Sequence, residues 1–276
     1  MTLSKNLWGK FKTIRRNKPS HTRMKKILLL SFTLLFSIQV QAQTTPVKIV
    51  NPQQQLWLAY FNQTRLSNRW GLWLDVHARR TGDFIDRWST QIYRPGITYY
   101  LSDQVRLTAG YAYVLHFPQT DGVAVRPEHR PWQQINWLGR FGKLHTNQWL
   151  RLEERFNRRM NGNELGEGYR FNYRFRYNLT VQVPLKGDRL QPGIPNFVVQ
   201  DELHINAGKQ INYNYFDQNR LFVGLAYPFT KSFLAQIGYM NVFVQQPAGN
   251  VFTDNHTIRL FLFHNLDFRQ PTDPVN

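Results

Sequence analysis

The chain has 276 residues and a formal net charge of +18, from 35 basic and 17 acidic residues, and it contains no cysteine. The lack of cysteine excludes disulfides, thiolate metal sites, cysteine nucleophiles and lipoprotein acylation. Nine of the basic residues precede Ile27, and the later ones are mostly arginines scattered through alternating segments rather than gathered in runs. We therefore expect a single domain and no nucleic-acid partner.

The N-terminal part has the features of a secretory signal. Residues Met24 to Gln43 comprise a basic start, an uncharged and largely apolar stretch, and the small-residue pattern Val40-Gln41-Ala42. The apolar run Ile27 to Ile38 is shorter than the ~20 residues of a membrane-spanning helix, which disfavours the alternative of a membrane anchor. We expect cleavage after Ala42.

This prediction divides the chain into two parts. Residues 1–42 form an extended n-region and a signal peptide, for which Met24 is the expected true start. Residues 43–276 form the mature protein, which we expect to be an outer-membrane β-barrel for the reasons that follow.

From Gln53 onward, apolar residues recur at period two, in segments of about ten or more residues. The clearest segment is Tyr169 to Val183, in which aromatic and aliphatic residues alternate with arginine, asparagine, threonine and glutamine. The same alternation occurs in Trp70 to Arg79, Val105 to Phe117 and Ile258 to Phe268. Long strands with many aromatics on the apolar face favour a membrane barrel over a soluble sandwich.

The segments between these strands alternate short and long, as periplasmic turns and extracellular loops do in outer-membrane barrels. The expected longer connections are 81–87, 118–130, 161–168, 207–217 and 246–254. Eleven strands can be counted from Gln53, whereas bacterial single-chain barrels have an even number, so Pro46 to Asn51 is the candidate for one more. The predicted fold is all-β: an antiparallel transmembrane β-barrel of about 12 strands, with about 10 as the alternative.

One internal repeat has no gaps. Gly96-Ile97-Thr98-Tyr99 through Gly110-Tyr111 matches Gly224-Leu225-Ala226-Tyr227 through Gly238-Tyr239 at a constant offset. Each copy is a strand, a short turn and a strand. We expect the glycines to point into the lumen where large side chains approach, which makes the repeat architectural.

Arginine gathers on the polar faces of the predicted strands. The acidic residues expected to face inward beside these arginines are Asp75, Glu153, Glu202 and Asp267. The histidines expected on the same polar faces are His77, His116 and His204. Rings of arginine would attract anions to a pore, whereas long guanidinium side chains that pair with carboxylates would instead fill a narrow barrel. The residues predicted to line the lumen are Arg79, Arg94, Arg106, Arg151, Glu153, Arg155, Arg170, Arg174, Arg176, Glu202, His204, Arg220 and Arg259.

Two acids, Glu154 and Asp201, fall on the lipid-facing phase of their strands. A β-bulge at Glu153-Glu154 would return the phase to the lumen and is the preferred explanation. The alternative is a lipid-hydrolysing site in which a carboxylate orients a histidine that activates a serine. The mature strands contain few serines, no G-x-S-x-G and no metal-ligand spacing of histidines, so we expect no catalytic residue, metal or cofactor.

The segment Arg126 to Trp132 concentrates charge, proline and an aromatic residue. If it is a loop, Glu128, His129, Arg130 and Trp132 would suit binding at the outer surface. The same segment could equally be a loop packed on the barrel mouth.

The chain resembles the uncharacterised outer-membrane family called domain of unknown function family 2490. The resemblance is carried by the Trp57 strand, Arg94-Pro95-Gly96, Gly110-Tyr111, Glu128 with Trp132-Gln133-Gln134, Arg151-Leu152-Glu153, and Asn219-Arg220 with Gly224. It implies an outer-membrane barrel of unassigned activity and supplies no catalytic residues. The tail Arg269 to Asn276 departs from the pattern, because barrels commonly finish on a terminal aromatic.

Together these features predict a narrow channel or a passive envelope component in the outer membrane of a Gram-negative bacterium. An outer-leaflet lipid-modifying enzyme and a surface binding protein that uses its long loops are the alternatives. The expected partners are outer-membrane lipid and, during insertion, the barrel-assembly machinery; no specific ligand is predicted.

Overall fold

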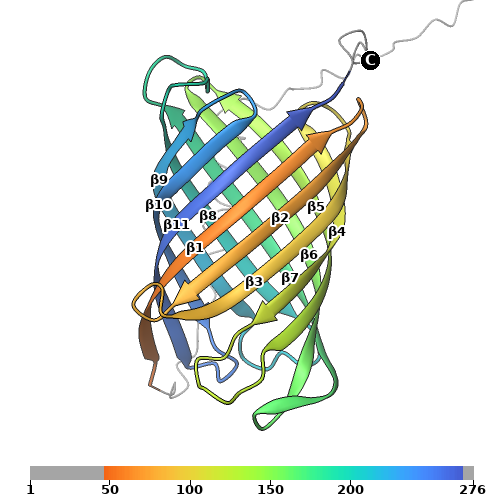
Figure 1. The fold of residues 1–276 in the computed structure, drawn as a ribbon, viewed down its shortest axis with the longest axis vertical. Helices are drawn as coiled ribbons and strands as arrows, with labels where there is room; N and C mark the ends of the chain where they lie inside the picture. The colour runs from red at the N-terminus through yellow and green to blue at the C-terminus, as the bar shows by residue number, and fades with distance from the viewer. Residues whose placement is uncertain (1–46, 270–276) are drawn as a thin grey trace, which may run out of the picture. The chain divides into compact units, whose positions relative to one another are not determined.

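The computed structural model describes residues 47–269, so the predicted signal segment lies outside the described residues. The described chain forms a single sheet that closes on itself (Figure 1). No helix in this part of the chain has the length and apolar character needed to cross a membrane. The eleven strands are β1 (Ile49–Arg65), β2 (Trp70–Thr81), β3 (Arg87–Tyr100), β4 (Val105–His116), β5 (Arg126–Phe141), β6 (Leu144–Asn161), β7 (Glu164–Pro184), β8 (Asn196–Ala207), β9 (Phe216–Pro228), β10 (Phe233–Gln245) and β11 (Val251–Asp267).

The barrel is closed by a parallel pair. Strands that follow one another in sequence pair antiparallel, whereas β1 pairs parallel with β11 from Ile49↔Val251 to Arg65↔Asp267. The all-β barrel is confirmed, but the described chain has eleven strands instead of the expected twelve. The stretch 49–51 continues β1 and is not a separate strand, and Pro46 lies outside the described residues. A parallel ladder can close the sheet, so an even number of strands is not a requirement of closure.

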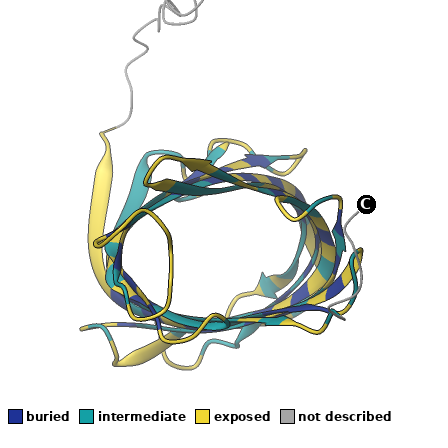
Figure 2. Cartoon of the chain, turned by 90° about the horizontal axis from the view of Figure 1, so that it is seen from above, coloured by how far each residue is buried: buried dark blue, intermediate teal, exposed yellow. Residues whose placement is uncertain are grey.

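Burial alternates along the strands, as the period-two pattern predicts. In β7, Asn172, Arg174 and Arg176 are buried inside the barrel, whereas Tyr173 and Phe175 between them are exposed on the outer face. Figure 2 shows the strands as a closed ring with buried and exposed residues alternating along them. The polar residues of this chain are therefore mostly inside the barrel, and the apolar residues are mostly outside.

The two ends of the barrel are called the upper and lower rims, as they lie in Figure 1. The upper rim carries the connections 66–69, 101–104, 142–143, 185–195 and 229–232, and the lower rim carries 82–86, 117–125, 162–163, 208–215 and 246–250. The expected alternation of short and long connections is only partly correct. The predicted loop 161–168 is a tight hairpin at 162–163, because β6 and β7 pair out to Asn161↔Glu164, and 185–195 is a long connection on the other rim.

The glycines of the internal repeat form two cross-strand pairs, Gly96–Gly110 and Gly224–Gly238. A Cβ atom on Gly110 would lie 2.9 Å from Trp132 Nε1, and one on Gly238 would lie 2.8 Å from a ring carbon of Phe222. Each pair thus leaves room for one large aromatic side chain inside the barrel, which confirms the predicted orientation of the glycines.

Candidate functional site

Two cavities occupy the lumen, one toward each rim. The lower cavity, of about 480 Å³, is lined near the rim by Gln53, Arg126, Arg170 and Asn214. The upper cavity, of about 590 Å³, is lined near the rim by residues that include Arg65 and Asp103. Every strand of the described chain belongs to the barrel wall, and the connections 208–215 and 246–250 also contribute to the lining of the lower cavity.

The two cavities share five lining residues, which we call the partition. Its members are Trp57, Arg79, Arg94, Arg176 and Arg220. Because these residues border both spaces, they stand between them across the middle of the lumen. Four of the five carry a permanent positive charge.

The lumen has a large excess of positive charge. Thirteen arginines line the two cavities, against seven carboxylates that line the cavities or are buried beside them, and five of these arginines make no ion pair with any described residue. The arginines are Arg65, Arg79, Arg94, Arg106, Arg126, Arg130, Arg151, Arg155, Arg170, Arg174, Arg176, Arg220 and Arg259, and the carboxylates are Asp75, Asp103, Glu128, Glu153, Glu202, Asp217 and Asp267. The arginines without an ion pair are Arg79, Arg106, Arg126, Arg170 and Arg259.

Two completely buried glutamates anchor the polar wall, which we define as the inner faces of β5 to β8. Glu153 accepts hydrogen bonds from Arg174 Nε at 2.8 Å and from Arg176 Nη1 at 2.5 Å. Glu128 accepts them from Arg130 Nε at 2.7 Å and from Arg155 Nε at 2.8 Å. Since Glu153 of β6 holds two arginines of β7 and Glu128 of β5 holds Arg155 of β6, these pairs link neighbouring strands through their side chains as well as through the backbone.

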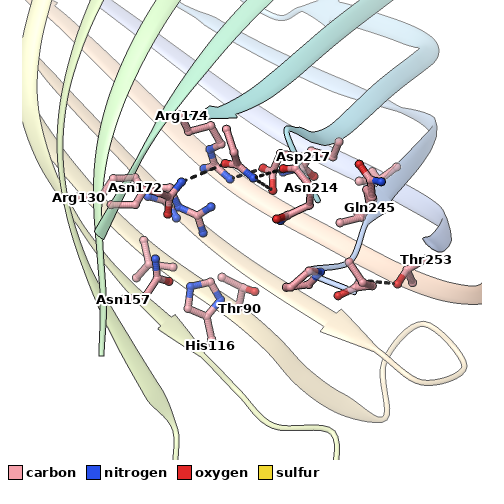
Figure 3. Close-up of a pocket in the computed structure, with 18 of the residues that line it drawn as sticks. Thr90, His116, Arg130, Asn157, Asn172, Arg174, Asn214, Asp217, Gln245 and Thr253 are labelled. Atoms are coloured by element: carbon pink, nitrogen blue, oxygen red, sulfur yellow. Dashed lines mark hydrogen bonds and ion pairs between the residues drawn. The ribbon is translucent and has the colours of Figure 1, made fainter. Parts of the chain in front are cut away.

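A β-bulge brings one further carboxylate, Asp217, into the lumen. The pairing of β8 with β9 shifts between His204↔Gln218 and Ile205↔Phe216, which leaves Asp217 unopposed. Asp217 turns inward and accepts a hydrogen bond from Arg174 Nη1 at 2.9 Å (Figure 3). The sequence placed Asp217 at the end of a loop, and only the register of the two strands reveals its position.

The bulge predicted at Glu153-Glu154 is wrong. The pairing of β6 with β7 is continuous there, with Glu153↔Arg174 followed by Glu154↔Tyr173. Glu154 is therefore on the outer face, where Gln133 donates a hydrogen bond to it at 3.5 Å, and Asp201 accepts one from Asn219 at 2.7 Å. Among the described residues, neither acid is hydrogen-bonded to a serine or a histidine, so the geometry gives no support to a lipid-hydrolysing site.

Aromatic rings hold two arginines, Arg79 and Arg259, on the opposite wall. We call this wall, made of the inner faces of β9 to β11, β1 and β2, the stacked wall. The guanidinium carbon of Arg79 lies 3.6 Å from the ring centroid of Trp57, and that of Arg259 lies 3.4 Å from the centroid of Phe222. Trp57 and Phe222 belong to an apolar cluster that also contains Met240 and Phe261. The ring faces attract these cations without neutralising their charge.

The structure puts all thirteen residues predicted to line the lumen on the inner face of the barrel. Eleven of them line at least one cavity, whereas Glu153 and His204 are enclosed behind other side chains. Arg170 is exposed at the lower rim. Asp267, expected as an inward partner, lines the upper cavity near the rim and accepts a hydrogen bond from Arg269 Nε at 2.9 Å.

The placement of Glu128, His129, Arg130 and Trp132 in a loop is wrong. These residues are part of β5, where Glu128, Arg130 and Trp132 are buried in the lumen. Proline 127 and proline 131 suggested a loop, but both occupy the outward phase of the strand, opposite Leu115 and Tyr111 of β4. The sequence did contain a signal for a strand here, because the prolines alternate with Glu128, Arg130 and Trp132 at period two. Only His129 of the four faces outward, where its ring packs on Tyr113 with centroids 5.5 Å apart.

The fold and this site define a closed β-barrel protein with an arginine-rich lumen. A family model described as "Protein of unknown function (DUF2490)" matches residues 54–253, and the chain belongs to that family, as its motifs predicted. An uncharacterized protein of Methylorubrum extorquens is 29% identical over 247 residues, which cover 88% of this chain and 97% of that protein. No solved structure matches the chain significantly.

Proposed function

We propose that the protein is an outer-membrane β-barrel of a Gram-negative bacterium, whose arginine-rich lumen forms a narrow channel that prefers anions. The observation that carries the proposal is the pair of arginine-lined cavities, one toward each rim, that have the side chains of the partition as a common border. Export by the predicted signal peptide and insertion by the barrel-assembly machinery belong to the same proposal.

The outer surface supports insertion into a membrane. Outward side chains in the middle of the strands are apolar and exposed, which would be unfavourable over so large an area in water but is what a lipid-facing band requires. Tyrosine and tryptophan lie toward both ends of this surface, as in the aromatic belts of membrane proteins. Examples of the apolar band are Leu72, Ile97, Leu107, Ile135, Leu150, Phe175, Leu203, Leu221, Ile237 and Ile258, and examples of the flanking aromatics are Trp70, Tyr99, Tyr113, Tyr169 and Tyr227.

The charge of the lumen supports a preference for anions. Among the residues that the structure describes, nine arginines but only one carboxylate, Asp217, line the lower cavity. A ring of fixed positive charge raises the local concentration of anions and repels cations from a narrow passage. The preference should therefore arise near the partition, where the passage is narrowest.

The partition decides between a channel and a passive envelope component. Arg176 and Arg220 are tied to Glu202, with Arg176 Nε 2.7 Å and Arg220 Nη1 3.4 Å from its carboxylate oxygens. Arg79 has only the ring of Trp57 as a partner, so it can move without breaking an ion pair. We infer that Arg79 is the member whose displacement connects the two cavities.

The test is the conductance of the full mature barrel in a planar bilayer, with reversal potentials measured across a salt gradient. We expect steady anion-selective steps. Arg79→Gln should weaken the anion preference and raise the conductance, because the shorter, neutral side chain removes charge and widens the partition. The control is Arg158→Gln, which should change neither the anion preference nor the conductance. Arg158 is on the outward phase of β6, with its guanidinium carbon 5.4 Å from the ring centroid of Tyr169. A folded barrel that never conducts would refute the channel and leave the passive envelope role.

A further inference from the structure

We propose that the lower cavity is a binding site for a small ligand that carries at least two phosphate groups. This inference deepens the proposed function and rests on it in one respect, since both require the lower cavity to be open to water at the rim. The inference concerns binding, so it can be tested without any conductance measurement.

Unpaired arginines from three strands of the cavity wall carry the argument. Arg126 of β5 and Arg170 of β7 lie near the lower rim, and Arg79 of β2 lies at the partition. None of the three makes an ion pair with a described residue, and the Nε atoms of Arg79 and Arg126 are buried without a hydrogen-bond acceptor. A buried donor without an acceptor costs free energy, which an anionic oxygen in the cavity would recover.

Arg126 and Arg170 are close enough to share a ligand. Asn157 of β6 pairs with Glu128 of β5 on one side and with Arg170 of β7 on the other. Arg126 is two residues before Glu128 on the same inner face. The two free guanidinium groups therefore project from the two strands beside β6, close to the same rim, an arrangement that suits a ligand with more than one anionic group.

The chemistry of the cavity favours phosphate as the anionic group. Guanidinium groups present a planar fork of donors that matches two phosphate oxygens at once. Asn157, Asn172, Asn206, Asn214, Gln210 and Gln245 also line the cavity and can bind hydroxyl groups of the same ligand. A volume of about 480 Å³ is in the range of small-molecule sites.

The carboxylates of the lumen do not serve as anionic partners for these unpaired arginines. Glu128 and Glu153 are completely buried behind Arg130, Arg155 and Arg174, and Asp217 is committed to Arg174 and Asn206. Figure 3 shows Arg174 directed toward Asp217, to which it donates a hydrogen bond. The paired arginines thus shape the site, while Arg79, Arg126 and Arg170 remain available to the ligand.

The experiment titrates inorganic pyrophosphate into the full barrel in detergent micelles and follows the heat of binding. We expect saturable binding near one ligand per barrel. Arg126→Gln with Arg170→Gln should weaken the affinity by about tenfold or more per arginine, because each removes charge-assisted hydrogen bonds. Arg158→Gln, on the outward phase of β6, should bind pyrophosphate as the unaltered protein does.

A second arm distinguishes two sources of the phosphate groups. Micelles that contain a lipid with a bisphosphorylated headgroup replace pyrophosphate as the probe. Binding of pyrophosphate supports a free ligand, whereas binding of the lipid alone supports a headgroup that reaches over the lower rim. Failure of both probes, or equal binding by the double variant, would overturn the site. A barrel that conducts but binds neither probe refutes this inference alone, and one that binds but never conducts refutes only the channel.

Discussion

The two walls of the lumen hold the same type of residue in different ways. On the polar wall, Arg174 and Arg176 reach buried carboxylates. Glu153 accepts a hydrogen bond from both of these arginines. On the stacked wall, Arg79 and Arg259 lie over aromatic rings and make no ion pair with a described residue. We expect the arginines that are paired with carboxylates to stabilise the barrel. The arginines that lie over aromatic rings keep a positive charge that can attract anions.

This comparison concerns stability as much as binding. A buried carboxylate that loses its arginines, or a buried arginine that loses its carboxylate, is an uncompensated charge, and its cost is large. A cation over an aromatic ring has a weaker attraction and no opposite charge to leave behind. Substitutions on the two walls should therefore differ strongly in their effect on the free energy of unfolding.

The largest effect is expected from Glu153→Gln. The variant leaves Arg174 and Arg176 without the full charge of their shared partner, so we expect a loss of about 3–5 kcal/mol in the free energy of unfolding. Urea unfolding of the barrel in lipid vesicles measures it. Glu154→Gln is the control one residue away on the outer face, and it should change the free energy by less than about 0.5 kcal/mol. Equal effects at the two positions would show that the buried pairs do not stabilise the polar wall.

An intermediate effect is expected from the glycine pairs. A Cβ atom on Gly110 would lie 2.3 Å from the carbonyl oxygen of Pro95, and one on Gly238 would lie 2.3 Å from that of Val223. Gly110→Ala and Gly238→Ala should each cost about 1–3 kcal/mol, because the added methyl group overpacks the space under Trp132 or Phe222. The same urea measurement applies, with Ala109→Val on the outer face as the control.

These two glycine variants sharpen the comparison of the two sides of the barrel. Each side has a pair of glycines that makes room for one aromatic ring, and each variant disturbs one of these pairs. If only one of them destabilises the protein, the two copies of the repeat do not have the same structural role. A cost close to zero for both would contradict the close approach of the aromatic rings.

The smallest effect is expected from Arg79→Met. Methionine keeps an apolar chain over Trp57 and removes only the charge, so the free energy of unfolding should fall by no more than about 0.5–1 kcal/mol. Arg174→Met is the matched variant on the polar wall, and it should cost about 3–5 kcal/mol because Glu153 and Asp217 lose their partner. A similar cost for both would mean that the two walls do not differ in the way described.

Much of the architecture could be predicted from the sequence. The period-two alternation in segments such as Tyr169 to Val183 indicated long strands and, with the signal features, a barrel. The same alternation placed Arg174 and Arg176 on one face and Phe175 on the other, which is the arrangement in the structure. Side-chain direction in a strand follows from local geometry alone, so a local pattern is sufficient to predict it.

Other features depended on segments that are far apart in the chain. The eleven-stranded closure requires β1 to pair with β11, and no local signal in either strand specifies that pairing. The bulge that turns Asp217 inward exists only in the register of β9 against β8. The prolines of β5 suggested a loop because the residues that pair with this strand could not be seen from its sequence.

The sequence by itself determined that the protein is an all-β barrel with arginines on its inner face, because strand periodicity is a local property of the chain. Only the tertiary structure decided which arginines are neutralised and which remain free. Arg174 meets Glu153 across β6 and β7, whereas Arg79 meets the ring of Trp57 across β1 and β2. The partner of each charge depends on the register of neighbouring strands, and that register is a property of the closed barrel.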